Sequence, residues 1–329
     1  MNPAEDLLLQ ASKLTLQLKD QPEPGEALRL KMEITRLTVQ AAIAREIGNS
    51  YLNLENILIL NDSNLELLRQ FQAYNNAQNP IGQCSCLSLL KLEDLSSEAA
   101  KILTSIPSIK IINFSQLNIT AELIDILKAS QIKQVGVYED NSKLTVDGVE
   151  LLTNLEADLA LDLGHLSEEE QIEASRRLKH FKGRRLSIGT SQGKSFPLEL
   201  LQHLQVLELD EITVRLELIT NEEAETLSQF KSQALNLAHL TSTLTDEVVR
   251  ILSNYNGKIY LGFEVLKGFN FASLLDSKAQ FIAYPDPNLT GNKLIEALKA
   301  IGNNKNLKFV LGQDKEVYAD EFLQLLTKS

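Results

Sequence analysis

Short stretches in which every second residue is apolar recur along the chain from about residue 86 onward. A period of two is typical of a β-strand that buries one face, because successive side chains of a strand point to opposite sides. The alternating pairs, which we expect to point into a shared core, are Leu87/Leu89, Ile109/Ile111, Val135/Val137, Leu159/Leu161, Leu186/Ile188, Leu207/Leu209, Leu235/Leu237, Ile259/Leu261 and Phe309/Leu311.

A hydroxyl residue preceded by an apolar one follows most of these stretches, and a helical pattern of about ten residues comes next. Ser and Thr at this place predict helix N-caps, because their side-chain oxygen accepts a hydrogen bond from a first-turn N–H group. Ser167 with Glu170, and Thr220 with Glu223, fit the reciprocal capping box. The expected caps are Ser96, Thr120, Thr145, Ser167, Thr220, Thr245 and Thr290, with a weaker copy that begins its helix at Ser195–Phe196 and another at Val317.

One strand and one helix recur at an average spacing of about 24 residues. A unit of this size is too small to bury its own apolar face, so neighbouring units must stack. The pattern therefore predicts an α/β solenoid, with a parallel sheet on one side and a row of helices on the other.

The strings LSLLKLEDLSSEAAKIL, LALDLGHLSEEEQI and LNLAHLTSTLTDEVVRIL resemble leucine-rich repeats. They are most similar to the helix-bearing, ribonuclease-inhibitor-like type and to divergent bacterial versions of it. The resemblance implies a sheet on the concave side and helices on the convex side, with about 10–11 repeats over residues 51–329. It also implies a scaffold that binds other proteins.

The first fifty residues do not repeat. Two amphipathic helical patterns flank a loop at residues 21–25, which predicts a helical hairpin. The end of a solenoid exposes apolar surface and needs an atypical unit to cover it, so we interpret residues 1–50 as an N-terminal helical cap. A dimerisation hairpin is the alternative.

Composition narrows the class of partner. The chain has 329 residues, 43% of them hydrophobic, and a formal net charge of -12, which favours a basic protein or peptide over nucleic acid or an anionic membrane. The first residues lack the basic and apolar stretches of a signal peptide, and no apolar run is long enough for a membrane span. We therefore expect a cytoplasmic protein, although secretion by a route that needs no signal peptide stays open, as does the oligomeric state.

Cysteine and histidine, which often serve as catalytic groups or metal ligands, are few in the sequence. Cys84 and Cys86 are the only cysteines, and no second Cys/His pair stands near them to complete a zinc site. The four histidines fall in different repeats without a shared ligand spacing. We therefore expect no metal, no cofactor and no enzymatic activity.

Two neighbouring features support an alternative function, the binding of an anion, a nucleotide or nucleic acid. The loop at residues 189–195 imitates a phosphate-binding loop but is one residue too short between its glycines. A basic run at residues 176–185 precedes it, and basic side chains there also complement a helix C-terminus. The candidate anion-binding residues are Arg176, Arg177, Lys179, Lys182, Arg184, Arg185 and Lys194.

The residues that alternate with the buried ones should face outward on the sheet. Tyrosine supplies a large contact area and carboxylates select a basic partner, so we predict a partner-binding concave face. Its members are Tyr138, Asp162, Glu208, Asp210, Asn236, Tyr260 and Tyr284. The competing interpretation is an ordinary solvated sheet, with function on the loops or the cap.

Overall fold

A computed structural model gives the fold of the chain. It describes residues 3–20, 22–44, 51–53, 57–78, 86–138, 142–190, 195–262, 274, 277–284, 299, 305–311 and 315–328.

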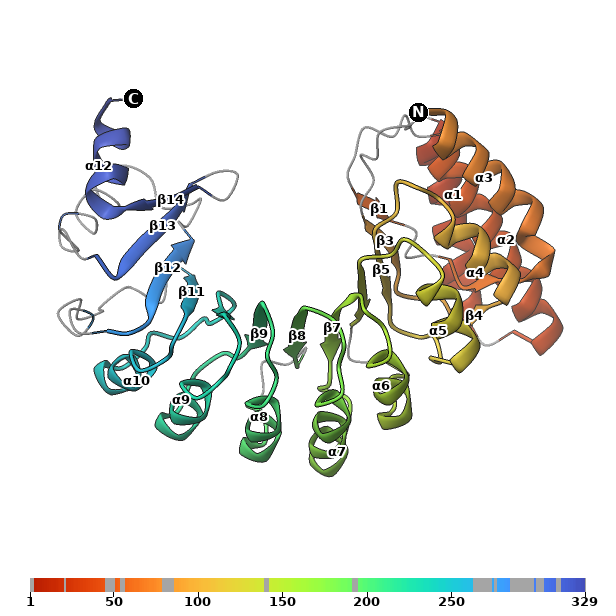
Figure 1. Cartoon of the computed structure of the whole chain (residues 1–329). Helices are drawn as coiled ribbons and strands as arrows, with labels where there is room; N and C mark the ends of the chain where they lie inside the picture. Colours follow the sequence, from red (N-terminus) through yellow and green to blue (C-terminus); the bar gives the residue numbers. More distant parts are fainter. Residues whose placement is uncertain are drawn as a thin grey trace. The chain divides into compact units, whose positions relative to one another are not determined.

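The chain divides into two compact units. Unit 1 comprises Met1–His165 with His180–Gly183, and unit 2 comprises Leu166–Lys179 with Arg184–Ser329. Each unit is built from parallel strands and the helices that connect them, as Figure 1 shows.

Unit 1 begins with two long helices, α1 (Pro3–Lys19) and α2 (Pro24–Ala44), which pack on each other. Ala11, Ile34 and Leu37 of this hairpin form a buried cluster with Leu58 and Ile59. The predicted helical hairpin is therefore present, and its apolar face is covered by the segment that follows it. The short strands β2 (Ile59–Leu60) and β4 (Asp94–Leu95) pair beside it.

The rest of unit 1 alternates strands and helices. Its strands pair in parallel in the order β1–β3–β5–β6–β7, and its helices α4, α5 and α6 lie in a row on one side of them (Figure 1). The elements are β1 (Tyr51–Asn53), η1 (Asp62–Asn64), α3 (Leu65–Gln78), β3 (Cys86–Leu89), α4 (Ser97–Thr104), β5 (Ile111–Phe114), α5 (Ala121–Lys128), β6 (Gln134–Val137), α6 (Val146–Leu152) and β7 (Asp158–Asp162).

Unit 2 repeats the same plan. Its strands run in the order β8–β9–β10–β11–β12–β13–β14, all parallel except the last pair. The elements are α7 (Glu168–Leu178), β8 (Arg185–Gly189), α8 (Leu198–Leu204), β9 (Glu211–Arg215), α9 (Asn221–Leu227), β10 (Ala234–Leu237), α10 (Asp246–Leu252), β11 (Lys258–Gly262), β12 (Gln280–Tyr284), β13 (Leu307–Leu311), β14 (Lys315–Tyr318) and α12 (Ala319–Lys328).

The helix starts confirm the hydroxyl pattern. Each described Ser or Thr cap except the copy at Ser195 accepts a hydrogen bond from the backbone N–H group three residues on. Both predicted capping boxes, Ser167–Glu170 and Thr220–Glu223, are complete. The helix after Ser195 starts later than predicted, at Leu198, and Pro197 occupies its N-cap position without a side-chain hydrogen bond. Thr290 lies outside the described residues.

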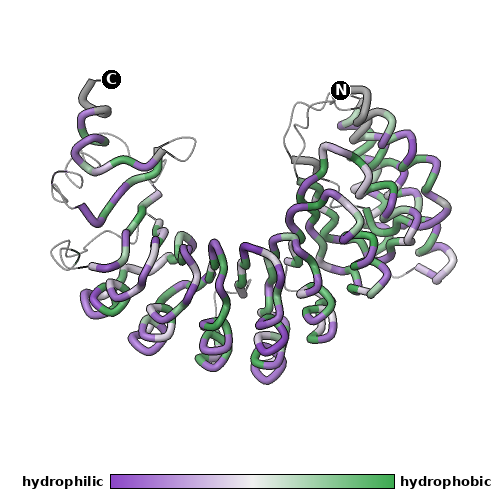
Figure 2. The backbone as a smooth tube through the Cα atoms, in the orientation of Figure 1, coloured by the Kyte–Doolittle hydropathy of each residue, from purple (hydrophilic) through white to green (hydrophobic). Residues whose placement is uncertain are grey.

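The core also follows the predicted periods. Seven pairs from Leu87/Leu89 to Ile259/Leu261 are buried as predicted, Leu207/Leu209 among them. Each helix from α4 to α10 also buries a closing leucine in its last turn: Leu103, Leu127, Leu152, Leu178, Leu204, Leu227 and Leu252. Figure 2 shows hydrophobic positions recurring along the strands, while the outer turns of the helices are mostly hydrophilic.

Two strands lie elsewhere than predicted. In β5 the buried residues are Ile112 and Phe114, because Ile112 aligns with Leu87 and Val135 of the neighbouring strands. The strand predicted around Leu207 and Leu209 is instead β9, which buries Ile212 and Val214.

The strand β14 was not predicted. The weak copy at Val317 predicted a helix here, and α12 begins directly afterwards, at Ala319. Val317 itself lies in β14, which runs antiparallel to β13 and places Val317 opposite Phe309. Two strands joined this closely along the chain pair antiparallel, since a parallel crossover needs a much longer connection.

Candidate interaction surface

One face of the unit 2 sheet carries side chains that do not enter the core. Ile259 and Leu261 point to the buried side of β11, so Lys258, Tyr260 and Gly262 point to the other. Directly paired residues share a face, and the registers therefore extend this outward face across the unit. Its middle row contains Ser187, Thr213, Asn236, Tyr260, Ile282, Lys308 and Tyr318.

Tyr260 and Tyr284 form the aromatic centre of this face. Their ring centroids lie 5.8 Å apart with an interplanar angle of 25°, which is a stacked arrangement. Tyr284 is 37% exposed and is among the large apolar side chains that the described part of the chain presents to solvent. The two predicted tyrosines are thus brought together on adjacent strands.

An apolar floor lies beside the tyrosines. Ile282 and Val310 also occupy outward positions, yet they are only 0% and 8% exposed. Neighbouring side chains therefore cover Ile282 and Val310, which form a packed apolar layer beside the tyrosines. Aromatic groups that a packed layer holds in place are typical of the core of a binding interface.

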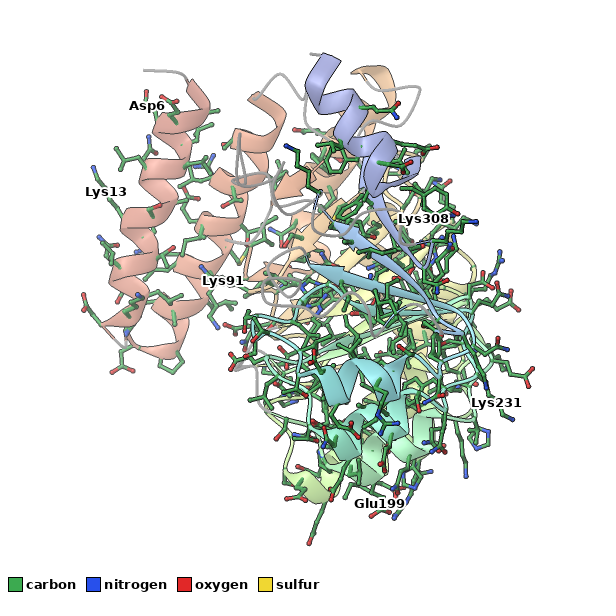
Figure 3. All side chains as sticks on the ribbon, turned by 90° about the vertical axis from the view of Figure 1, so that its left-hand side faces the viewer. Asp6, Lys13, Lys91, Glu199, Lys231 and Lys308 are labelled. Carbon is green, nitrogen blue, oxygen red and sulfur yellow. The ribbon has the colours of Figure 1, made fainter. Side chains whose placement is uncertain are left out.

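A charged cluster borders the same floor. The Glu316 carboxylate of β14 accepts hydrogen bonds from Lys258 of β11, at 2.6 Å, and from Lys308 of β13, at 3.3 Å. The Lys308 Nζ atom also lies 5.4 Å from the centre of the Tyr318 ring. Figure 3 shows Lys308 near the C-terminal strands.

The titration of this cluster reflects its contacts. Burial raises the pKa of Glu316, but the hydrogen bonds from Lys258 and Lys308 outweigh it and leave that pKa below its ordinary value. The hydrogen bond to Glu316 in turn raises the pKa of Lys258. Both shifts favour the charged forms, so the ion pair of Glu316 with Lys258 is present at neutral pH.

Asn236 lies next to the tyrosines and is already engaged. Its Nδ2 atom donates to Glu211 at 2.8 Å, and its Oδ1 atom accepts from the backbone N–H of Ala238 at 3.0 Å. Thr213 donates to the same Glu211 carboxylate at 3.3 Å. These bonds fix the orientation of the side chains beside Tyr260.

Two further predicted residues belong to unit 1. Asp162 ends β7 and is 6% exposed, and its Oδ1 atom accepts from the backbone N–H of Gly164 at 2.8 Å. Its carboxylate therefore shapes the turn after the strand. Tyr138 follows β6 and lies so close to Gly136 that a Cβ atom there would meet its ring at 2.3 Å.

The predicted positions of Glu208 and Asp210 on the sheet are wrong. Both precede β9, so neither belongs to a strand, and Asp210 pairs with Arg184. The acidic character expected of the sheet face rested on these two carboxylates and on Asp162. Two of these three carboxylates are therefore not on a strand of the sheet.

Three arginines of the basic run form ion pairs with nearby acids. Arg176 binds Glu173 and Glu199, and Arg177 also binds Glu173. Arg184 also forms an ion pair, with Asp210. Anion binding by the run stays a prediction. Lys179, Lys182 and Arg185 are exposed, and Lys194 lies outside the described residues.

Histidine and cysteine side chains have structural contacts. The Nε2 atom of His165 lies 2.6 Å from the Leu144 carbonyl oxygen, and Nδ1 of His203 lies 2.8 Å from the Ser175 hydroxyl. Burial raises the pKa of Cys86, partly offset by a hydrogen bond from Asn113. Burial, and next Arg215, lowers the pKa of His239.

Metal ligands do not gather in the described ranges. No three of the His, Cys, Asp and Glu side chains placed there are grouped so that they could hold a metal ion. Cys84 is outside these ranges. Nor is any helix of the described chain long and apolar enough to cross a membrane.

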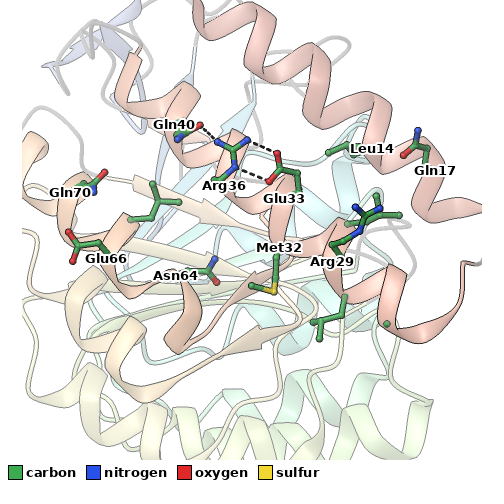
Figure 4. Close-up of a pocket in the computed structure, with 14 residues that line it drawn as sticks. Leu14, Gln17, Arg29, Met32, Glu33, Arg36, Gln40, Asn64, Glu66 and Gln70 are labelled. Atoms are coloured by element: carbon green, nitrogen blue, oxygen red, sulfur yellow. Dashed lines mark hydrogen bonds and ion pairs between the residues drawn. The ribbon is translucent and has the colours of Figure 1, made fainter.

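A concave region lies within unit 1, between the N-terminal hairpin and α3. Figure 4 shows its lining, which includes Leu14, Met32 and the ion pair of Glu33 with Arg36. Its volume is about 960 Å³. The lining mixes apolar and paired charged side chains, and nothing in it selects one class of ligand.

From β3 to β11, parallel strands lead to one another through helices that most often begin at a Ser or Thr cap, and this repeat defines an α/β solenoid of the leucine-rich-repeat type. The leucine-rich repeat-containing protein LegL7 from Legionella pneumophila is 14% identical to the chain and gives a TM-score of 0.45. That match covers 83% of this chain and 97% of LegL7. A leucine-rich repeat protein from Leptospira interrogans is 15% identical with a TM-score of 0.24, over 82% of this chain and 79% of its own. No protein-family model matches the sequence, and no curated protein matches it.

Proposed function

We propose that the chain is a non-enzymatic scaffold that binds a protein or peptide through the outward face of the unit 2 sheet. The observation that carries the proposal is the stacked pair Tyr260–Tyr284 beside the buried Ile282 and Val310. Rigid aromatic groups next to an apolar floor contribute much of the binding energy in protein interfaces. The strands hold these groups in place before binding, which lowers the entropy cost of association.

Several titratable side chains of the described residues have structural contacts. His165 contacts a backbone carbonyl oxygen, and His203 contacts the Ser175 hydroxyl and lies 3.7 Å from the Glu199 carboxylate, which Arg176 also binds. A scaffold needs a stable, repeated surface rather than groups with strongly shifted pKa values.

Selection from a random peptide library displayed on phage tests the proposal. The full chain serves as bait, and each selected peptide is then titrated against a Tyr260→Ser, Tyr284→Ser double variant. We expect the double variant to bind about tenfold or more weakly, because it loses two interfacial aromatic groups.

A matched control uses Val206→Ser with Leu218→Ser, which replaces apolar side chains that are 57% and 51% exposed in unit 2 but lie outside its strands. This variant should bind as the original chain does, and circular dichroism verifies that both variants fold. Equal affinity of the tyrosine variant and the original chain would contradict the proposal.

A further inference from the structure

The outward face of unit 2 has the opposite charge to the chain as a whole. The chain carries a formal net charge of -12. Among the described residues, however, the charged side chains at outward strand positions of unit 2 include four basic and two acidic groups. These are Arg185, Arg215, Lys258 and Lys308, with Glu211 and Glu316.

Such segregation matters because a net charge of -12 repels acidic molecules on average. A local excess of positive charge then attracts an acidic segment to this face and to few others. The acids that were expected here lie elsewhere: Asp210 pairs with Arg184 ahead of the strand, and Glu208 also precedes β9.

Glu316 shows how a carboxylate fits the face. It lies within hydrogen-bond distance of two lysines on different strands, and each ammonium group has three donors. One carboxylate uses only part of that capacity. The Lys258 side chain is 43% exposed, so a second carboxylate has access to it from solvent.

We propose that the partner is an acidic peptide segment that contains aromatic or large apolar residues. This inference rests on the proposed function and names the class of partner for the same face. Carboxylates of the segment bind Lys258 and Lys308, and an aromatic or apolar side chain packs on the exposed part of Tyr284. The proposal replaces the basic partner that the net charge favoured.

Fluorescence anisotropy of two labelled peptides tests the charge preference on the full chain. One is Glu-Glu-Tyr-Glu-Glu-Tyr-Glu-Glu, and the other has Lys in place of every Glu. We expect the acidic peptide to bind more tightly, and its affinity to fall as salt is raised, because salt screens exposed charges. Tighter binding of the Lys peptide, or no binding of the acidic one, would overturn the proposal.

Two substitutions in the cluster should change the affinity for the acidic peptide in opposite directions. Lys308→Gln removes a positive charge and should weaken binding by about twofold to fivefold, whereas Glu316→Gln removes the competing carboxylate and should strengthen it by a similar factor. Lys231→Gln is the control, because it removes the same charge from an exposed position away from Lys308 (Figure 3) and should change nothing.

The directions of the two affinity changes show whether the cluster binds the peptide or only stabilises the fold. If Lys308→Gln and Glu316→Gln both weakened binding, the cluster would be structural and the acidic class would be wrong. If the acidic peptide failed while the phage-selected peptides still depended on Tyr260 and Tyr284, only this inference would fall. If the selected peptides also ignored the tyrosines, the proposed function itself would fall.

Discussion

Single hydroxyl groups fix where most of the repeat helices begin. In α10, the Thr245 side chain accepts from the backbone N–H of Val248 at 3.2 Å and so satisfies a donor that the helix leaves unpaired. This interaction is local in sequence. The sequence alone could therefore predict the caps. It could also predict most of the alternating buried residues, because a period of two likewise involves only residues close in the sequence.

Replacing one cap tests this contribution. We expect Thr245→Ala to lower the free energy of unfolding by about 1 kcal/mol, because a first-turn N–H group loses its acceptor. Thr243→Ala, an exposed position two residues earlier in the same loop, is the control and should cost much less. Denaturant titration followed by circular dichroism measures both, and equal losses would show that the cap hydroxyl does not stabilise the helix.

The binding face needed information that single residues do not carry. Tyr260 and Tyr284 were predicted to face outward, but their stacking depends on the register that sets Gly262 opposite Tyr284. The pairing of Lys258 with Glu316 joins residues far apart in the sequence. Neither contact follows from a period of two.

At the scale of elements, spacing predicts strands better than alternation does. From β5 to β11, each strand begins six to eight positions after the buried leucine in the last turn of the helix before it. Arg185, for example, follows Leu178 by seven positions. Alternation continues on both sides of Asp210, so it could not choose between Leu207/Leu209 and Ile212/Val214. The spacing from Leu204 selects Glu211, where β9 begins.

The terminal hairpin shows the limit of the repeat pattern. The copy at Val317 predicts the helix α12 but not the strand β14, which lies only a few residues after β13 and pairs with it antiparallel. The hairpin places Glu316 and Tyr318 on the outward face. The residues that complete the charged cluster were missed for this reason.

The link between β14 and β11 should depend on pH. The pKa of Glu316 lies below its unfolded value, so its stabilisation is fully present above pH ~4.3 and is lost as pH falls through the lower folded value. We expect Glu316→Gln to reduce the free energy of unfolding by about 0.5–1 kcal/mol at pH 7 and by a smaller amount at about pH 3.

Denaturant titrations of the original chain and the variant at both pH values measure this difference. Glu225→Gln, at an exposed position of α9, is the control for loss of one carboxylate and should show no comparable change between the two pH values. An equal loss for Glu316→Gln at pH 3 and pH 7 would mean that the ion pairs with the lysines do not stabilise the hairpin.

At the scale of the whole molecule, composition and local surface point to different partners. The formal charge of -12 favours a basic partner, whereas the described outward face of unit 2 is net positive. Net charge averages over the entire surface, but a partner contacts only one face. The class of fold could be predicted from the repeats, whereas the chemistry of the partner depended on which side chains the strand registers bring together.

Photo-crosslinking tests the central claim, that this sheet face is the binding surface, most directly. Tyr284 is replaced by p-benzoylphenylalanine in one preparation, and Gln202, an exposed residue of α8, in another. With peptides selected on the original chain, we expect crosslinks from position 284 and none from position 202. Crosslinks from position 202 without any from position 284 would contradict the account and place binding on the helices.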